Sequence, residues 1–319
     1  MRTSITRREF LGAALIAAPL LGLSASAMAK SRLPFRLGII TDEISDDLDQ
    51  ALNFIANYSL PGCELRDMWG KNIMDSSQAD LTHARHLIQD YNLKVSDIGS
   101  PIFKYNLPQM PVRPEKQGQG FGAAFTEKDS DKLLLKSFDL AHYFGTKKVR
   151  VFSYWRVKEP DKAYPYVRDR LAKAAELAGK NGILLVLENE FECNIGTGKE
   201  LGRILRDINS PHLRGNWDPG NAALLHEIPY PDGYNAVAGL FAHMHVKDVR
   251  KDPSTGRLVW APVGGGFIDW KGQIKAVLDR PYRGTMSLET HYRRADGNRI
   301  ESTRESLLGL LKIIHEEQA

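Results

Sequence analysis

The sequence predicts a (β/α)8 TIM barrel, an α/β fold, in a single domain preceded by an export signal. From Phe35 onward, short apolar and β-branched runs alternate with amphipathic segments of helical period, and about eight such pairs follow one another. Four of the later runs also end in an acidic or imidazole side chain, which places candidate chemistry at one mouth of the barrel.

The composition of each run justifies its assignment. Arg36–Thr41 (RLGIIT) and Lys148–Ser153 (KVRVFS) are β-branched, and Leu184–Glu188 (LLVLE) is apolar up to its last residue. Glu127–Phe144 places its apolar residues on one helical face. The expected strands, in order, are Arg36–Thr41, Gly62–Arg66, Lys94–Gly99, Lys148–Ser153, Leu184–Glu188, Leu213–Asp218, Phe241–His245 and Thr285–Glu289. The expected helices are Asp46–Asn57, Gln78–Tyr91, Glu127–Phe144, Tyr164–Lys180, Lys199–Ile208, a short segment near Tyr234–Gly239, Lys271–Leu278 and Ile300–Glu317.

A doubly wound open sheet is the rival architecture. It is expected to carry a glycine-rich turn after an early strand, with an acidic residue about 20 residues further on. No such turn follows Ile40 or Arg66, so the barrel is favoured.

The bulk composition is that of a globular protein with a core. The chain has 319 residues, 42% hydrophobic and 26% charged, with a formal net charge of +4. Without Arg2, Arg7, Arg8 and Glu9, which together carry +2, the remaining charge is +2. That weak and scattered charge argues against nucleic acid as a partner.

The N-terminus predicts a targeting segment. Thr6–Leu11 (TRREFL) resembles a twin-arginine export motif, and the apolar stretch Leu11–Leu23 and small residues over Ala25–Ala29 follow it. Because that stretch is shorter than the ~20 residues of a membrane span, we expect a cleaved signal over residues 1–29, a periplasmic location and no stable membrane span after cleavage. An uncleaved anchor is the alternative. The barrel is expected over residues 33–319.

The sequence also contains two cysteines and two long loops. Cys63 and Cys193 are expected to be isolated structural thiols. The loops Pro101–Thr126, which includes Phe121, and Val249–Phe267 are open to two interpretations, a wall or lid of the pocket and a surface excursion. The glycine run at the end of the second loop lacks the pattern of a phosphate-binding loop.

Four strand ends form the candidate metal site. If the runs are successive parallel strands, Glu188, Asp218, His245 and Glu289 converge at one mouth, and three carboxylates with one imidazole suit a hard or borderline divalent cation. Singly each residue has an ordinary explanation; Asp218, for instance, opens a common Asp-Pro-Gly turn.

The chain resembles the xylose isomerase-like barrel superfamily of sugar phosphate isomerases and epimerases. The matching pieces are Leu187–Asn189 (LEN), Trp217–Asn221 (WDPGN), His243–Asp248 (HMHVKD) and Leu288–Glu289, within a resemblance that runs from about Leu33 to the C-terminus. It implies one divalent cation, Mn²⁺, Co²⁺ or Mg²⁺ with Zn²⁺ as a further candidate, held by Glu188, Asp218, His245 and Glu289. It also implies that the catalytic residues Glu188 and Glu289 flank the reacting carbon.

One position departs from the ketose 3-epimerases of this group. They carry a histidine three positions after the metal-binding aspartate, where this chain has Asn221. The group also includes endonuclease IV, which needs further histidines for three zinc ions, and the early strand ends offer no such set. A simple free-ketose epimerase and a DNA-repair enzyme are both disfavoured.

Further residues near the strand ends are candidates for binding a small-molecule carbohydrate. Aromatic faces suit sugar C–H surfaces, and cationic or amide groups bind its oxygens. The candidates are Arg66, Trp69, Lys104, Trp155, Arg156, Asn221, His243 and Lys247. Each aromatic residue could instead pack under a loop, and Lys247 could be exposed.

These residues predict a metal-dependent sugar isomerase or epimerase that abstracts a proton next to a metal-bound carbonyl. An alternative is a lyase or dehydratase that eliminates from a 3-keto sugar or glycoside, which export and Asn221 favour. A non-catalytic periplasmic carbohydrate-binding barrel is a third candidate, although binding alone does not require two flanking glutamates. Oligomeric state has no signature in the sequence.

Overall fold

The computed structural model of the chain describes residues 33–110, 112, 125–280 and 282–318. The predicted signal over residues 1–29 lies outside the described residues. Across those that are described, no helix has both the length and the apolar character needed to cross a bilayer.

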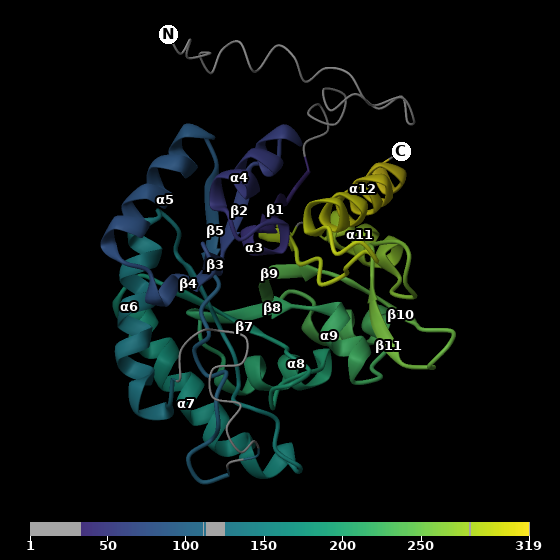
Figure 1. The fold of residues 1–319 in the computed structure, drawn as a ribbon. Helices are drawn as coiled ribbons and strands as arrows, with labels where there is room; N and C mark the ends of the chain where they lie inside the picture. Colours follow the sequence, from purple (N-terminus) through teal and green to yellow (C-terminus); the bar gives the residue numbers. More distant parts are fainter. Residues whose placement is uncertain (1–32, 111, 113–124, 281, 319) are drawn as a thin grey trace, which may run out of the picture. The chain divides into compact units, whose positions relative to one another are not determined.

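Eight parallel strands close into a barrel in the order β1-β12-β9-β8-β7-β6-β5-β2, which confirms the predicted TIM barrel (Figure 1). All neighbouring pairs are parallel, including the closing pairs of β1 with β12 and with β2. The barrel strands are β1 Arg36–Ile40, β2 Gly62–Leu65, β5 Lys94–Ile98, β6 Lys148–Val151, β7 Leu184–Glu188, β8 Leu213–Trp217, β9 Phe241–Val246 and β12 Thr285–Leu288.

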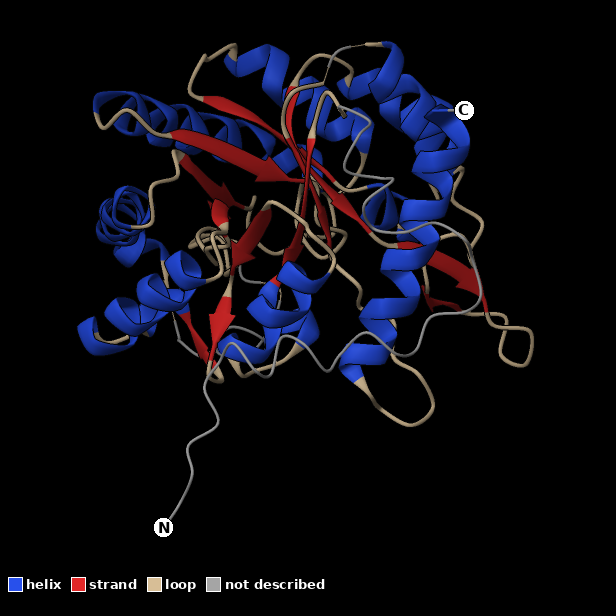
Figure 2. Cartoon of the chain, turned by 90° about the horizontal axis from the view of Figure 1, so that it is seen from above, coloured by secondary structure: helices blue, strands red, loops and turns tan. Residues whose placement is uncertain are grey.

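Helices lie outside the ring of strands (Figure 2). They are α3 Thr41–Ile44, α4 Leu48–Asn57, α5 Gln78–Asp90, α6 Ser130–Tyr143, α7 Pro160–Lys180, α8 Gly198–Ile208, α9 Pro219–Leu224, α10 Tyr234–Val237, α11 Trp270–Asp279 and α12 Arg299–Gln318. Shorter helical turns cover Ile73–Asp75, Glu127–Asp129 and Pro229–Gly233. The boundaries follow local chemistry, since Ser77 and Thr197 each form a capping box.

Several boundaries differ from the sequence prediction. α7 begins four residues earlier than expected because Pro160 stands in its first turn, where the missing N–H costs nothing. The short helices α3 and α9 were not expected. α3 begins directly after β1 and α9 begins one residue after β8, and both fix backbone at the mouth of the barrel.

The core lies where the inner faces of the helices meet the strands. β7 is buried at four of its five positions, and buried helical residues such as Leu171 and Leu201 lie against the barrel. Cys63 and Cys193 are buried and free, as expected for structural thiols, and burial raises the pKa of the Cys63 thiol to about 12.

Two small antiparallel hairpins project beyond the strand ends. β3 (Asp67–Met68) pairs with β4 (Lys71–Asn72) after β2, and β10 (Asp248–Lys251) pairs with β11 (Leu258–Ala261) after β9. Most of the β10–β11 hairpin therefore lies in Val249–Phe267, which the sequence analysis treated as a loop.

The glycine run after β11 is held by Asp248. Its carboxylate accepts hydrogen bonds from the N–H groups of Gly264, Gly266 and Ile268. A Cβ at Gly266 would overlap Asp248 Oδ1, so the close approach requires glycine there. Since Asp248 already uses these N–H groups, the run is a structural turn and not a phosphate cradle.

The first residues of the loop Pro101–Thr126 are packed, whereas the described positions 108–110 are exposed. Phe103 and Tyr105 are buried and lie against Tyr154, with ring centroids 5.2 Å and 5.7 Å from its ring. Phe121 lies outside the described residues.

Candidate metal centre

Glu188, Asp218, His245 and Glu289 meet at the C-terminal mouth of the barrel. Glu188 ends β7, Asp218 follows β8, His245 lies in β9, and Glu289 follows β12. One ligand atom from each lies within 4.8 Å of the others, and all four residues are buried. They converge because the carboxyl ends of parallel strands share one rim.

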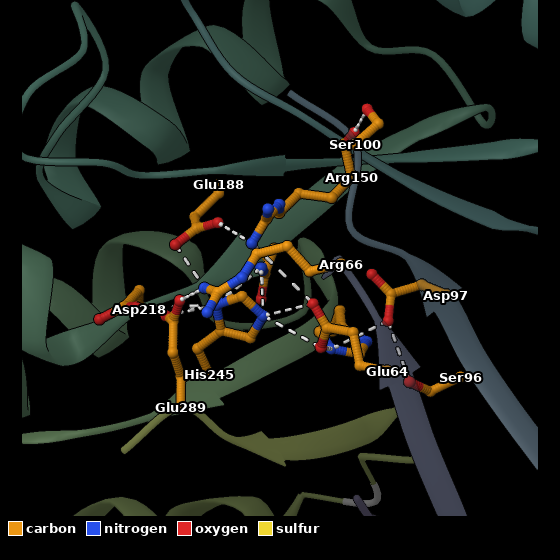
Figure 3. A network of polar contacts seen from close by, with 12 residues as sticks. Glu64, Arg66, Ser96, Asp97, Ser100, Arg150, Glu188, Asp218, His245 and Glu289 are labelled. Carbon is orange, nitrogen blue, oxygen red and sulfur yellow. Dashed lines mark hydrogen bonds and ion pairs between the residues drawn. The ribbon is translucent and has the colours of Figure 1, made fainter. Parts of the chain in front are cut away.

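His245 lies at the centre of this cluster (Figure 3). Its Nδ1 is 3.3 Å from Glu188 Oε1, 3.2 Å from Glu289 Oε2 and 3.8 Å from Asp218 Oδ2. Its Nε2 faces the opposite way and is 3.2 Å from Glu64 Oε1.

Three cations surround the carboxylates. Lys247 Nζ is 2.9 Å from Asp218 Oδ2 and 2.6 Å from Glu289 Oε2. Arg66 Nη1 is 2.7 Å from Glu289 Oε1, and Arg150 Nη1 is 3.3 Å from Glu188 Oε2. These charges offset the repulsion among carboxylates that the barrel forces together.

The surroundings give the acids different proton affinities. Burial alone would raise the pKa of Glu188, but the charges of His245 and Arg150 outweigh it and lower this pKa to about 2. Burial likewise opposes ionisation of Glu289, yet Lys247 and His291 hold its pKa well below the usual range. Burial dominates at Asp218 and raises its pKa to about 6 despite Lys247. All three are carboxylates at neutral pH, the state in which they can bind a cation.

The donor set fits a divalent cation. Three carboxylates and one imidazole match the oxygen and nitrogen ligands of Mg²⁺, Mn²⁺, Co²⁺ and Zn²⁺. Glu188 Oε2 and Asp218 Oδ2 are buried, and each has a cationic neighbour, Arg150 Nη1 at 3.3 Å and Lys247 Nζ at 2.9 Å. A carboxylate oxygen can accept from two partners, so both oxygens retain capacity to bind a cation.

Three of the predicted substrate-binding residues lie at this cluster. Arg66 and Lys247 contact Glu289 directly, and the Asn221 Nδ2 group donates to Glu188 Oε1 at 3.2 Å. α9 places Asn221 here, because Asp218 caps that helix by accepting from the Asn221 backbone N–H. Asn221 therefore borders Glu188, one of the two residues predicted from the sequence to be catalytic.

The other predicted residues lie elsewhere. His243 is fully buried and faces Glu64, 3.1 Å from its Oε2. Lys104 pairs with Glu190 at 2.9 Å and lies 5.7 Å from the centre of the Trp155 ring.

Two of them are committed to other partners. Trp69 stacks on His83 with ring centroids 5.3 Å apart. Arg156 donates to Glu200 and to the carbonyls of Cys193 and Asn194, which ties the loop after β7 to the start of α8.

Sequence reasoning missed residues on the other side of the barrel. Glu64 and Arg150 are fully buried inside β2 and β6. Both faces of a parallel barrel strand are covered, so a charge in mid-strand must face a buried polar partner, and this signal could have identified them.

The rim residues His291 and Trp260 were also missed. The Trp260 ring, on β11, lies 5.2 Å from Lys247 Nζ and 5.2 Å from the His291 ring. It stands at the rim because of the β10–β11 hairpin, which no sequence pattern indicated.

Residues 52–313 match the family model of the xylose isomerase-like TIM barrel. None of the curated proteins compared with the chain matches its sequence.

Solved structures share the fold at low identity. A D-allulose 3-epimerase from Methylomonas sp. is 17% identical with a TM-score of 0.66, over 88% of this chain and 98% of that one. A probable 3-DHS dehydratase from Bacillus anthracis is 16% identical with a TM-score of 0.65, over 85% and 98%. A xylose isomerase-like TIM barrel protein from Mycobacterium smegmatis, in complex with magnesium, is 19% identical with a TM-score of 0.62, over 92% and 99%. This chain spans only 43% of a fusion of such a barrel with a 4-hydroxyphenylpyruvate dioxygenase.

Proposed function

This chain belongs to the xylose isomerase-like TIM barrel family, and on that basis we propose that it is a divalent-metal-dependent isomerase or epimerase of a sugar. The observation that carries the proposal is the buried convergence of Glu188, Asp218, His245 and Glu289 within 4.8 Å. The sugar epimerase and the magnesium complex among its structural neighbours support the same class.

These four residues would hold Mn²⁺, Co²⁺, Mg²⁺ or Zn²⁺. When bound, such an ion polarises a carbonyl oxygen and so acidifies the neighbouring C–H group.

Glu188 and Glu289 would move the proton. They come from β7 and β12, which β8 and β9 separate in the barrel, so they approach the centre from two sides. One carboxylate accepts the proton from carbon. The other returns it on the opposite face, which is epimerisation, or at the adjacent carbon, which is isomerisation.

The rim groups suit a carbohydrate. Lys247, Arg66 and Asn221 offer donors for hydroxyl or carbonyl oxygens, and each already contacts one of the glutamates. Trp260 presents an aromatic face beside Lys247, suited to the C–H surface of a sugar ring.

We further propose that the protein is exported. The twin-arginine-type segment over residues 1–29 would direct it to the periplasm, where an unphosphorylated sugar or glycoside is the expected substrate. Replacing Arg7 and Arg8 with Lys should retain the protein in the cytoplasm of the expressing cell, which fractionation detects. Unchanged export would contradict this part of the proposal.

A lyase or dehydratase is the second candidate. Asn221 replaces the histidine of ketose 3-epimerases and binds Glu188, so the proton acceptor has a different neighbour. A probable dehydratase is also among the similar structures. In that case a carboxylate would take the proton next to the carbonyl, and the electron pair left on carbon would form a C=C bond as the group on the β carbon departs.

The test follows hydrogen exchange and mass together. Mn²⁺-loaded protein is incubated in D₂O with sugars and 3-keto glycosides, and products are identified by NMR and mass spectrometry. Deuterium uptake at one carbon, with the product otherwise unchanged, supports the isomerase or epimerase. Loss of water or an aglycone supports the lyase, and binding without exchange or turnover supports a binding protein.

Matched variants show whether the cluster is responsible. Glu188→Gln and Glu289→Gln should lower turnover about 10²–10⁴-fold. Glu190→Gln is the control, since Glu190 lies just beyond the same strand but pairs with Lys104. Equal losses in all three variants would contradict the assigned roles.

A further inference from the structure

Glu64 lies on the far side of His245 from the three candidate ligand carboxylates (Figure 3). It occupies the third position of β2 and is fully buried. His245 Nε2 is 3.2 Å from both Glu64 oxygens, whereas Nδ1 faces Glu188 and Glu289 at 3.3 Å and 3.2 Å. The two ring nitrogens thus have two different environments.

The chemistry of imidazole gives these environments different roles. A neutral histidine carries one N–H donor and one lone pair, and only the lone pair can bind a cation. Carboxylates face both ring nitrogens. A cation bound among Glu188, Asp218 and Glu289 would decide between them, because it would take the Nδ1 lone pair. The remaining proton would lie on Nε2, where Glu64 accepts it. The lone pair of Nδ1 then faces the cluster of Glu188, Asp218 and Glu289.

Glu64 is itself held in place. Its Oε2 is 3.1 Å from His243 Nε2, and Arg150 Nη1 lies 3.9 Å from Oε1 while also pairing with Glu188. The neighbouring Asn216 amide nitrogen is 3.1 Å and 3.3 Å from the two His245 nitrogens. Such similar distances place that amide against the ring face, away from either lone pair.

We propose that Glu64 is the positioning residue of the cation site: it accepts the Nε2 proton of His245 and thereby fixes the tautomer and ring orientation that direct Nδ1 at the ion. This inference rests on the proposed function, because it requires the four-residue cluster to bind a cation. Carboxylates behind a metal-binding histidine act in this way in other metal sites.

The first test is the affinity for Mn²⁺, measured by calorimetry. Glu64→Gln keeps the size of the side chain and should weaken binding about 10–100-fold. Asp97→Asn is the matched control. Asp97 is equally buried on the neighbouring strand β5 and lies 3.6 Å from His243 Nε2, without a contact to His245 in the described structure. Its affinity should stay near that of the wild type.

The second test separates positioning from packing and needs no variant at Glu64. In Zn²⁺-loaded wild-type protein with ¹⁵N-labelled histidine, the Nε2 of His245 should retain a directly bound proton and Nδ1 should not. His245→Gln identifies the signals. A proton on Nδ1, or zinc bound through Nε2, would overturn the proposal even if Glu64→Gln failed to fold.

The outcomes distinguish the two claims. Wild-type protein that binds no divalent ion would overturn both the proposed function and this inference. Tight binding by the wild type and equally tight binding by Glu64→Gln would overturn the inference alone. An equal loss in Asp97→Asn would also overturn it, because the effect would then be one of buried charge in general.

Discussion

The two arcs of the barrel carry their charges in different places. In the arc of β7, β8, β9 and β12, the acids Glu188, Asp218 and Glu289 stand where strands end. In the arc of β1, β2, β5 and β6, Glu64 and Arg150 stand inside strands. The acids of the first arc converge on one side of His245 beside Lys247 and Arg150, whereas both oxygens of Glu64 have imidazole neighbours on its other side. We infer that the arc of β7, β8, β9 and β12 binds the cation. The arc of β1, β2, β5 and β6 holds the cation-binding residues in position.

Removal of the ion should have the largest effect, and it should act through the first arc. Treatment with a chelator should abolish turnover, and added Mn²⁺ should restore it. The metal-free barrel should remain folded because its core is apolar. Its unfolding free energy should be about 2.7 kcal/mol lower than that of the protein in the presence of the ion at a concentration of 100 times Kd. Assays and thermal melts with and without the chelator measure both. Full activity after chelation would remove the reason for treating this arc as a binding arc.

Arg150→Met tests the second arc. It leaves Glu64 and Glu188 buried without the guanidinium that lies 3.9 Å and 3.3 Å from them. Removing one partner of a buried ion pair typically costs about 3–5 kcal/mol, so metal-free protein should lose about that much unfolding free energy in urea. Lys275→Met, which removes an exposed cation of α11, serves as control. Equal unfolding free energies for Arg150→Met and Lys275→Met would mean that Arg150 does not stabilise the cluster from the second arc.

Asp248→Ala asks whether a residue close to the site in sequence belongs to either arc. It deprives the N–H groups of Gly264, Gly266 and Ile268 of their acceptor. Loss of the acceptor at the N–H of buried Ile268 would cost about 1–3 kcal/mol, whereas water can replace the acceptor at exposed Gly264 and half-buried Gly266, where the cost is smaller. The expected result is lower stability in urea with unchanged Mn²⁺ affinity. If Asp248→Ala lost Mn²⁺ binding while its unfolding free energy stayed unchanged, Asp248 would instead belong to the arc that binds the cation.

Arg156→Ala should have the smallest effect. Its loss removes a partly exposed ion pair with Glu200 and hydrogen bonds to two backbone carbonyls, so the unfolding free energy should fall by about 1–2 kcal/mol. Mn²⁺ affinity and KM should not change, because the guanidinium contacts the start of α8 and not the cluster. A clear rise in KM would return Arg156 to the substrate-binding residues that the sequence suggested.

The sequence revealed the first arc because its acids end apolar runs. Glu188 is the last residue of the run LLVLE, and Asp218 precedes a proline that starts a helix. Because strands alternate with helices, the strands are parallel and their last residues meet at one rim. The same alternation identified all eight barrel strands within a residue or two at each end.

The second arc was missed because a lone charge within a short strand resembles a solvent-facing position. Glu64 in GCELR shows its role only once barrel closure covers both faces. The positions of two loop residues could not be predicted for a different reason. Trp69 and Trp260 each stand on a hairpin whose direction no periodicity encodes, so one lies against His83 and the other beside Lys247.

The most direct test of the account is the stoichiometry of Mn²⁺ binding to the wild type and to Asp218→Asn, measured side by side. Asn keeps the shape of the side chain but removes the negative charge that Asp218 contributes to the cluster and to its ion pair with Lys247. The account predicts one ion per chain for the wild type and severely weakened binding for the variant. Equal binding by both proteins, or none by the wild type, would contradict the assignment of this cluster as the metal centre.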